Sequence, residues 1–250
     1  MKEKYSRNRL YVSSEEQDVI KDKRILLGGA GIGSIIAECA IRFGFEKMTI
    51  VDGDVVEESN LNRQNYCQSD IGKYKAETLA KRLLAINPHA QIAYLNEMIT
   101  HDNLVGLIEG HDIAINALDF NSDIPFALDE ECRKRDIPVL HPYNFGWAGF
   151  LTIVSPHGEP ITVLSNNPPG FELKMANYVT QYCAFWQNPK KWLQNIIERY
   201  GKEVGNMPPP QLSVGSWIAA GYCVNAMYRL STSKEVHFFP NFYLSASVNE

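Results

Sequence analysis

Residues 24–64 read RILLGGAGIGSIIAECAIRFGFEKMTIVDGDVVEESNLNRQ, and they carry the clearest structural pattern in the chain. A continuous apolar run stops at residue 28, where a glycine-rich turn begins, as in a strand buried on both faces. Apolar residues then recur at helical spacing until Gly44, a residue type that commonly ends helices. A second apolar run over residues 48–51 stops at Asp52. The pattern therefore predicts a strand, a glycine turn, a helix and a second strand.

The same alternation of patterns continues along the chain. Helical spacing of apolar residues recurs over residues 72–87, 103–109 and 124–134. Strand-like patterns occupy residues 91–99, 113–118, 138–140 and 149–154. Because strands and helices alternate, we expect an α/β fold of the doubly wound, Rossmann-like kind, with a largely parallel sheet and helices on both faces.

We expect a single domain over residues 1–250, built in three parts. Residues 1–23 form an N-terminal arm or helix, because Ser13 is followed three residues later by an acid, as in a capping box. Residues 24–154 form the alternating core. Residues 155–250 form a C-terminal insertion that covers it. Within this last third we expect helices over residues 171–200 and 216–230 and a strand-like tail over residues 236–244.

Composition and charge narrow the classes of protein to which the chain can belong. Its 250 residues are 45% hydrophobic and 21% charged, with a net charge of −5 and no long run of lysine or arginine, which argues against a nucleic-acid partner. The N-terminus lacks the apolar core of a signal peptide, and no apolar run is long enough to span a bilayer. Five scattered cysteines form no CxxC pair. We expect a cytoplasmic protein without membrane contact.

The glycine turn predicts a nucleotide site in the core. Glycine lets the backbone approach a phosphate, and the following helix offers free N–H groups and partial positive charge. Asp52 comes about 20 residues later, where an acid can bind ribose hydroxyls. The glycines expected to contact the nucleotide are Gly28, Gly29, Gly31 and Gly33.

Polar residues beyond the second strand favour a triphosphate over a nicotinamide dinucleotide. The sequence SNLNRQ occupies residues 59–64, and Arg63 with Lys75 can clamp charged phosphates. Asp119 follows a later buried strand, at the edge of the sheet where Mg²⁺ could be held beside those phosphates. A nicotinamide-dependent oxidoreductase would leave these residues without a role.

On these residues the chain resembles the ThiF, MoeB and HesA family of enzymes that adenylate ubiquitin-like proteins. The resemblance covers roughly residues 4–154 and is strongest in VDGDVVEESNLNRQ and DIGKYKAE. It implies ATP-dependent adenylation of the C-terminal carboxylate of a small ubiquitin-like or sulfur-carrier protein that ends in Gly-Gly, with release of pyrophosphate. ATP and Mg²⁺ are the implied cofactors. The last third would hold the crossover and the carrier-docking surface.

The resemblance also implies a role for each matching residue. Asp52 would bind ribose, Asp54 would support the adenosine end, and Asp119 would hold magnesium. Tyr5-Ser6-Arg7-Asn8 resembles the family's R-Y-x-R-Q, whose second arginine enters the neighbouring subunit's site, so Arg7 implies a homodimer. The residues implied to contact phosphates are Asn60, Arg63, Gln64 and Lys75.

Several features depart from the family pattern and keep alternatives open. Ala30 stands in the glycine turn where the family usually has glycine, and Phe120 follows Asp119 where a polar residue is common. The family's zinc CxxC pairs are absent, so no zinc is expected. Cys183 is a candidate thioester site, although its aromatic neighbours favour an inert buried thiol. His141 fits a structural role better than a place in the cleft.

The alternative functions are adenylation of a different acceptor, such as a tRNA base or a peptide carboxylate, and a nucleotide-binding scaffold without catalysis.

Overall fold

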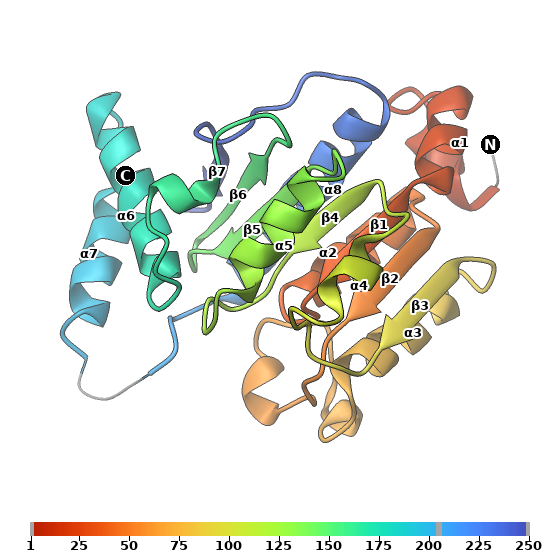
Figure 1. The fold of residues 1–250 in the computed structure, drawn as a ribbon, viewed down its shortest axis with the longest axis horizontal. Helices are drawn as coiled ribbons and strands as arrows, with labels where there is room; N and C mark the ends of the chain where they lie inside the picture. The colour runs from red at the N-terminus through yellow and green to blue at the C-terminus, as the bar shows by residue number, and fades with distance from the viewer. Residues whose placement is uncertain (1–2, 204–206, 249–250) are drawn as a thin grey trace.

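The computed structural model describes residues 3–203 and 207–248, which form one seven-stranded sheet in the order β3-β2-β1-β4-β5-β6-β7 (Figure 1). The first five strands in chain order pair in parallel, and the last two pair antiparallel at one edge. The strands are β1 (Arg24–Gly28), β2 (Lys47–Val51), β3 (Gln91–Leu95), β4 (Ile113–Asn116), β5 (Val139–Asn144), β6 (Ala148–Val154) and β7 (Tyr243–Ala246).

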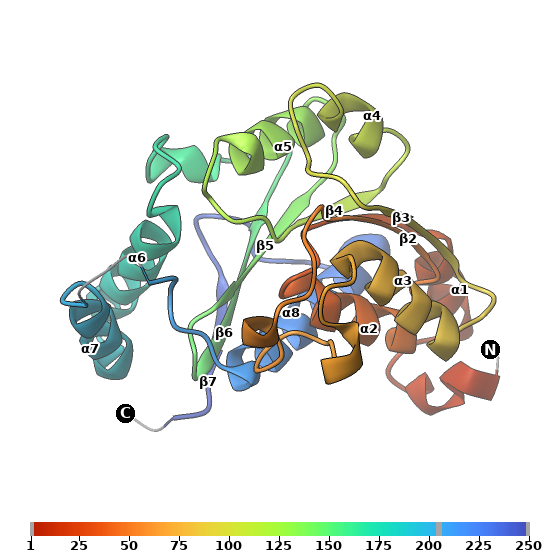
Figure 2. The ribbon, with the colours of Figure 1, turned by 90° about the horizontal axis from the view of Figure 1, so that it is seen from below.

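Helices cover both faces of this sheet, which confirms the doubly wound, Rossmann-like prediction. Figure 2 shows α2, α3 and α8 on one face and α4 and α5 on the other. In the described part of the chain, no helix is both long and apolar enough to cross a membrane. The α-helices are α1 (Ser14–Asp22), α2 (Gly33–Phe43), α3 (Lys75–Ile86), α4 (Leu104–Ile108), α5 (Ile124–Arg133), α6 (Phe171–Phe185), α7 (Lys191–Tyr200) and α8 (Ser213–Ser231). The 3-10 helices are η1 (Glu3–Asn8), η2 (Glu58–Asn60), η3 (Gln68–Asp70) and η4 (Ile161–Val163).

The two faces of the central strands pack into two separate apolar clusters. In β1, Ile25 and Leu27 lie in the cluster that contains α2, α3 and α8, whereas Leu26 lies in the cluster that contains α4 and α5. Successive side chains of a strand point to opposite faces, so a strand covered on both faces needs an unbroken apolar run. This explains why the run before the glycine turn shows no polar alternation.

The last third of the chain both completes and covers the core. Helix α8 packs against α2 and against β5 and β6, and β7 extends the sheet beside β6. Helices α6 and α7 lie beyond the β6–β7 edge (Figure 2). The predicted helices are confirmed, but the strand-like tail over residues 236–244 is wrong in extent, because only Tyr243–Ala246 pairs with β6.

The N-terminal arm is fixed to the edge of the sheet where the strands begin. The Tyr5 side chain is buried, and its hydroxyl donates to Glu46 just before β2. The predicted capping box of α1 is confirmed, since Ser13 Oγ accepts from Glu16 N at 3.2 Å and Glu16 Oε2 accepts from Ser13 N at 2.9 Å.

Candidate nucleotide-binding site

The residues predicted from the sequence to bind a nucleotide follow the carboxyl ends of three neighbouring strands. Gly28 pairs with Val51 of β2 on one side and with Asn116 of β4 on the other. The glycine turn (residues 28–33), Asp52 and Asp119 therefore leave the sheet at one edge. In open α/β sheets, ligands bind in the crevice at this edge.

Two glycines of the turn are closely packed, and the backbone contact at Gly29 requires glycine there. Gly29 has φ +91°, and a Cβ there would lie 2.4 Å from the Ala117 carbonyl oxygen. A Cβ on Gly33 would lie 2.8 Å from Leu27 Cδ1. Ala30 is not among the residues with positive φ, so its methyl group is tolerated in the position where the sequence departs from the family pattern.

The middle of the turn offers donors to an anion. Within the described chain, the N–H groups of Gly31 and Ile32 have no hydrogen-bond acceptor. A Cβ on Gly31 would lie 3.3 Å from Gln64 Nε2, so Gln64 lies directly against the turn. Gln64 Oε1 is buried and has no hydrogen-bond partner among the described residues. Because an amide can rotate to exchange oxygen and nitrogen, Gln64 can offer either group to a ligand.

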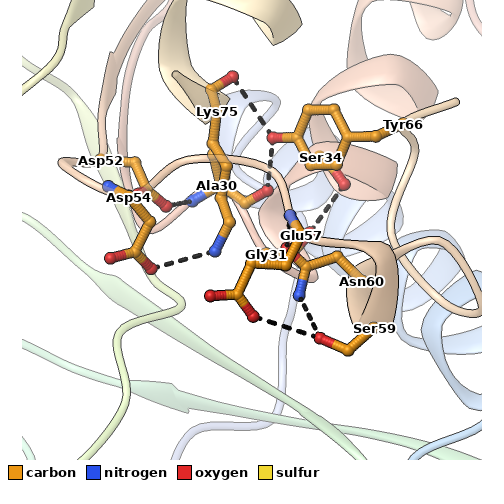
Figure 3. Close-up of polar contacts among 10 residues, drawn as sticks. All are labelled: Ala30, Gly31, Ser34, Asp52, Asp54, Glu57, Ser59, Asn60, Tyr66 and Lys75. Carbon is orange, nitrogen blue, oxygen red and sulfur yellow. Dashed lines mark hydrogen bonds and ion pairs between the residues drawn. The ribbon is translucent and has the colours of Figure 1, made fainter. Parts of the chain in front are cut away.

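Asp52 connects the glycine turn to the segment after β2 (Figure 3). Its two carboxylate oxygens accept from Ala30 N at 2.6 Å and from Asp54 N at 2.8 Å. Burial raises the pKa of Asp52, while these two hydrogen bonds and the charge of Lys75 oppose the rise. Each carboxylate oxygen keeps a lone pair, so the held side chain can still accept from ribose hydroxyls.

Lys75 is held at the start of α3 beside the same turn. The side chain is largely buried, and its Nζ lies 3.0 Å from Asp54 Oδ2 (Figure 3). The Tyr66 hydroxyl donates to the Ala30 carbonyl at 2.8 Å and lies 3.3 Å from the Lys75 carbonyl. Tyr66 therefore fixes the backbone of Lys75 against the backbone of the turn.

The arginine loop (residues 57–66) places Arg63 through three hydrogen bonds. Arg63 Nη1 donates to Ser59 O at 2.7 Å and to Asn62 Oδ1 at 2.8 Å. Arg63 Nε donates at 2.7 Å to Oε1 of Gln211, which comes from the segment before α8. Burial lowers the pKa of Arg63, and the nearby Asp119 carboxylate opposes this, so the guanidinium stays charged at neutral pH.

Asn60 shapes the arginine loop. Its Oδ1 accepts from Glu57 N at 3.0 Å, which caps η2, and the residue is buried. Its Nδ2 lies 3.5 Å from Ser59 Oγ (Figure 3). The contact between Asn60 and phosphate stays a prediction.

Asp119 lies within the electrostatic field of the same cations. Desolvation by the surrounding protein raises the pKa of its carboxyl, the Glu172 carboxylate raises it further, and Lys75 and Arg63 oppose the rise. Solvent still reaches the Asp119 side chain, which weakens these effects. The next residue, Phe120, is buried against Phe171, so an apolar residue suits this position.

The remaining residues considered in the sequence lie elsewhere. Arg7 is exposed on η1, which is anchored where the strands begin, at the opposite edge of the sheet from the glycine turn (Figure 1). His141 is buried on β5, with Nε2 2.9 Å from both carboxylate oxygens of Asp129, and its Nδ1 is buried without a hydrogen-bond partner among the described residues. Cys183 is buried in α6 within the core, the setting of an inert thiol.

Three residues at the site carried no signal in the sequence. Gln211 is 148 residues from Arg63 along the chain, and a glutamine after three prolines suggests no contact of this kind. Glu172 acts on the site through the charge of Asp119. Tyr66 acts on it through its hydrogen bond to the backbone of the turn. Tertiary contacts alone place all three.

Two cavities lie away from these residues. One of about 330 Å³ opens over the first residues of β1, β2 and β3 and is lined in part by Arg24, Lys47 and His111. The other, about 270 Å³, lies between α5 and η4. Neither is lined by the glycine turn or the arginine loop.

Comparisons with known proteins identify the family to which this fold and site correspond. Residues 5–249 match the model of the ThiF family. The chain is 30% identical over 160 residues to the SAMP-activating enzyme E1 of Haloferax volcanii, covering 62% of this chain and 59% of that protein. It is 32% identical over 143 residues to the tRNA threonylcarbamoyladenosine dehydratase of Bacillus subtilis, covering 56% of each.

The fold has a counterpart among solved structures. Escherichia coli MccB, solved with AMPCPP and MccA, superposes with a TM-score of 0.69 at 17% identity, covering 98% of this chain and 71% of MccB. The chain spans less than two thirds of the length of the two relatives named above. The match over residues 5–249 nevertheless takes in the glycine turn, the arginine loop and the last third, and the chain belongs to the ThiF family.

Proposed function

We propose that this chain is an ATP-dependent adenylyltransferase acting on a small ubiquitin-like or sulfur-carrier protein whose C-terminus is Gly-Gly. The observation that supports it is the gathering of Asp52, Lys75, Arg63 and Asp119 at the edge where β1, β2 and β4 end. A glycine turn with free N–H groups suits any nucleotide. Lys75 and Arg63 are cations held in place by hydrogen bonds, and they lie near the Asp119 carboxylate. This combination suits a nucleoside triphosphate whose phosphates take part in a reaction.

In the proposed reaction, a carboxylate oxygen of the carrier attacks the α-phosphorus of ATP. The bond from that phosphorus to the oxygen bridging to the β-phosphate breaks, and pyrophosphate leaves. Arg63 and Lys75 balance the phosphate charge, and Asp52 accepts from the ribose hydroxyls. Because hydrogen bonds already hold these side chains, catalysis is by positioning and electrostatics and needs no protein nucleophile.

Magnesium suits the site as a partner of the phosphates. No group of three or more His, Cys, Asp or Glu side chains gathers as a metal site in the described part of the chain. Mg²⁺ is usually held by one or two carboxylates together with substrate phosphates. We assign Asp119 as its carboxylate, and the bound ion supplies positive charge to the phosphates.

We assign docking of the carrier to residues 155–250. Phe185 and Trp186 at the end of α6 are 77% and 64% exposed, and Trp217 in the first turns of α8 is 53% exposed. Exposed aromatic side chains of this size are favoured in protein interfaces. Trp217 lies six residues after Gln211, whose side chain accepts from Arg63 of the arginine loop.

The test is ATP–pyrophosphate exchange with purified small proteins that end in Gly-Gly. Arg63→Ala and Asp119→Ala should each reduce carrier-dependent exchange by about 10²–10³-fold, the usual loss when a charge-stabilising group is removed. Arg135→Ala, which removes a surface arginine bonded to Glu131, is the matched control and should keep wild-type exchange. Unchanged exchange in both site variants would contradict the assignment.

We propose that the working form is a homodimer in which Arg7 enters the partner's site. Arg7 lies at the far edge of the sheet from its own glycine turn, which is consistent with action in trans. Arg7→Ala and Asp119→Ala should each be inactive alone. Mixing them by unfolding and refolding together should restore about a quarter of wild-type exchange, since half of the dimers then contain one complete site. Arg9→Ala is the control, and absence of restoration would contradict trans action.

A second candidate acceptor is supported by the relative named a tRNA dehydratase. The acceptor would then be a modified tRNA nucleoside and not the C-terminus of a carrier protein. Its net charge of −5 counts against a broad RNA surface. Transfer of labelled AMP to tRNA, with no exchange for any carrier, would favour this candidate. We propose the cytoplasm as the location for either, a reducing compartment that suits a chain whose five cysteines form no CxxC pair.

A further inference from the structure

Arg63 is bonded to a part of the chain far from its own loop. Its Nε donates to Gln211 Oε1 at 2.7 Å, and Asn62 Nδ2 of the same loop donates to the Gln211 carbonyl at 3.3 Å. Gln211 therefore contacts the arginine loop through its side chain and through its backbone. Among the described residues, the Arg63 Nη2 group has no hydrogen-bond partner and is left to bind a ligand.

Gln211 is itself held from both sides. Three prolines at 208–210 precede it and restrict the backbone to extended conformations. Asn144 at the end of β5 holds the next residue, because its Nδ2 donates to the Leu212 carbonyl at 2.7 Å and its Oδ1 lies 3.4 Å from Leu212 N. Asn144 Nδ2 also donates to Ser216 in the first turn of α8 at 2.8 Å.

These contacts form a continuous path from the sheet to the arginine. β5 fixes Asn144, Asn144 fixes Leu212, and Gln211 beside it fixes one edge of the guanidinium. Arginine loses about 2 kcal/mol of rotamer freedom when it is ordered, and an acceptor that orders it beforehand lowers that cost at the moment of binding. A neutral amide does this without cancelling the positive charge that phosphates require.

We propose that Gln211 is a positioning residue, which orients Arg63 toward the phosphates of the nucleotide. This rests on the proposed function for the phosphate role of Arg63. It differs from that proposal in placing part of the nucleotide site on the segment that leads into α8. Contacts in that segment then act directly on the phosphate-binding arginine.

The variant that tests this is Gln211→Met, which keeps the length of the side chain and removes the acceptor. It should weaken ATP binding about tenfold, the equivalent of one hydrogen bond to a charged group, and leave the binding of adenosine unchanged. Gln211→Glu restores an acceptor but adds a negative charge beside the guanidinium, so it should also bind ATP more weakly than wild type. Gln91→Met on the exposed edge strand β3 is the control substitution and should match wild type.

A double-mutant cycle separates positioning from general support of the fold. In an Arg63→Ala background, Gln211→Met should cause no further loss of ATP affinity. Equal losses for ATP and adenosine, or a full additional loss in that background, would overturn the inference. Wild-type protein that binds ATP but gives no exchange with any carrier would contradict the proposed adenylation. The double-mutant cycle would still test the positioning role, because it measures ATP affinity alone. Full exchange and unchanged ATP binding in Gln211→Met would contradict the positioning role alone.

Discussion

The glycine turn and the arginine loop lie side by side and are held by different kinds of contact. The turn is fixed by close packing, with Gly29 against the Ala117 backbone and Gly33 against the Leu27 side chain. The arginine loop is fixed by side-chain hydrogen bonds, two of them to Gln211 far along the chain. A local sequence pattern can specify the first arrangement, whereas only the complete fold specifies the second.

Because the two regions are held differently, we expect substitutions in them to affect different properties of the protein. Changes in the turn act on close packing and on the pairing of β1 with β4, so we expect them to affect folding first. Changes in the arginine loop act on exposed or half-buried polar groups, so we expect them to affect ligand binding first. Tyr66 joins the two regions, because it belongs to the loop and donates to the turn.

The largest effect is expected in the turn. Gly29→Ala places a methyl group 2.4 Å from the Ala117 carbonyl at a φ of +91°, and backbone atoms on both sides must move. We expect a loss of about 3 kcal/mol or more in the free energy of unfolding, measured by urea denaturation. Gly72→Ala is the matched control, since its φ of +82° carries the same strain but nothing lies within 4 Å of the new Cβ. It should cost about 1–2 kcal/mol, and equal losses for the two would show that packing contributes nothing.

An intermediate effect is expected where the two regions meet. Tyr66→Phe removes the donor at 2.8 Å from the buried Ala30 carbonyl and keeps the ring in place. The unfolding free energy should fall by about 1–2 kcal/mol because a buried acceptor loses its partner. ATP affinity should fall as well, since the Lys75 backbone lies 3.3 Å from the same hydroxyl. Tyr74→Phe, at an exposed tyrosine, is the control. A loss of stability without any loss of affinity would mean that the turn and Lys75 are positioned independently.

The sequence predicted those parts of the molecule that depend on local pattern. The unbroken apolar run before Gly28 is a direct consequence of a strand covered on both faces, and the helical spacing after it places apolar side chains of α2 in the core. Asp52 and Asp119 were found because polar residues at strand ends share one edge of a parallel sheet.

Other parts could not be predicted, because their partners are distant in sequence. Arg63 could be recognised as a cation, but its acceptor Gln211 lies 148 residues away. The tail over residues 236–244 has an apolar pattern typical of a strand, yet only its end reaches β6. Pairing depends on where α8 delivers the chain, and a local pattern carries no information on that.

The smallest expected effect concerns the charge of Asp119. Its folded-state pKa is raised, so between the unfolded value of 3.8 and that higher value the folded state binds more protons than the unfolded state. Stability therefore falls as the pH rises through this window, and the loss persists at neutral pH. Asp119→Asn lacks the charge and should be more stable than wild type at pH 7, by less than about 1 kcal/mol because solvent reaches the side chain.

The pH dependence of that difference identifies its cause. Well below pH 3.8 the carboxyl is protonated in both states, so the stability advantage of Asp119→Asn should vanish there in parallel urea titrations. Glu172→Gln, which keeps the acceptor for the Phe120 N–H, removes the carboxylate that acts on Asp119 and should reduce the advantage. An Asn variant less stable than wild type at pH 7 would mean that Asp119 supports the fold. If Asp119→Asn gains stability and loses exchange, the charge of Asp119 is needed for the ligand and destabilises the fold when no ligand is bound.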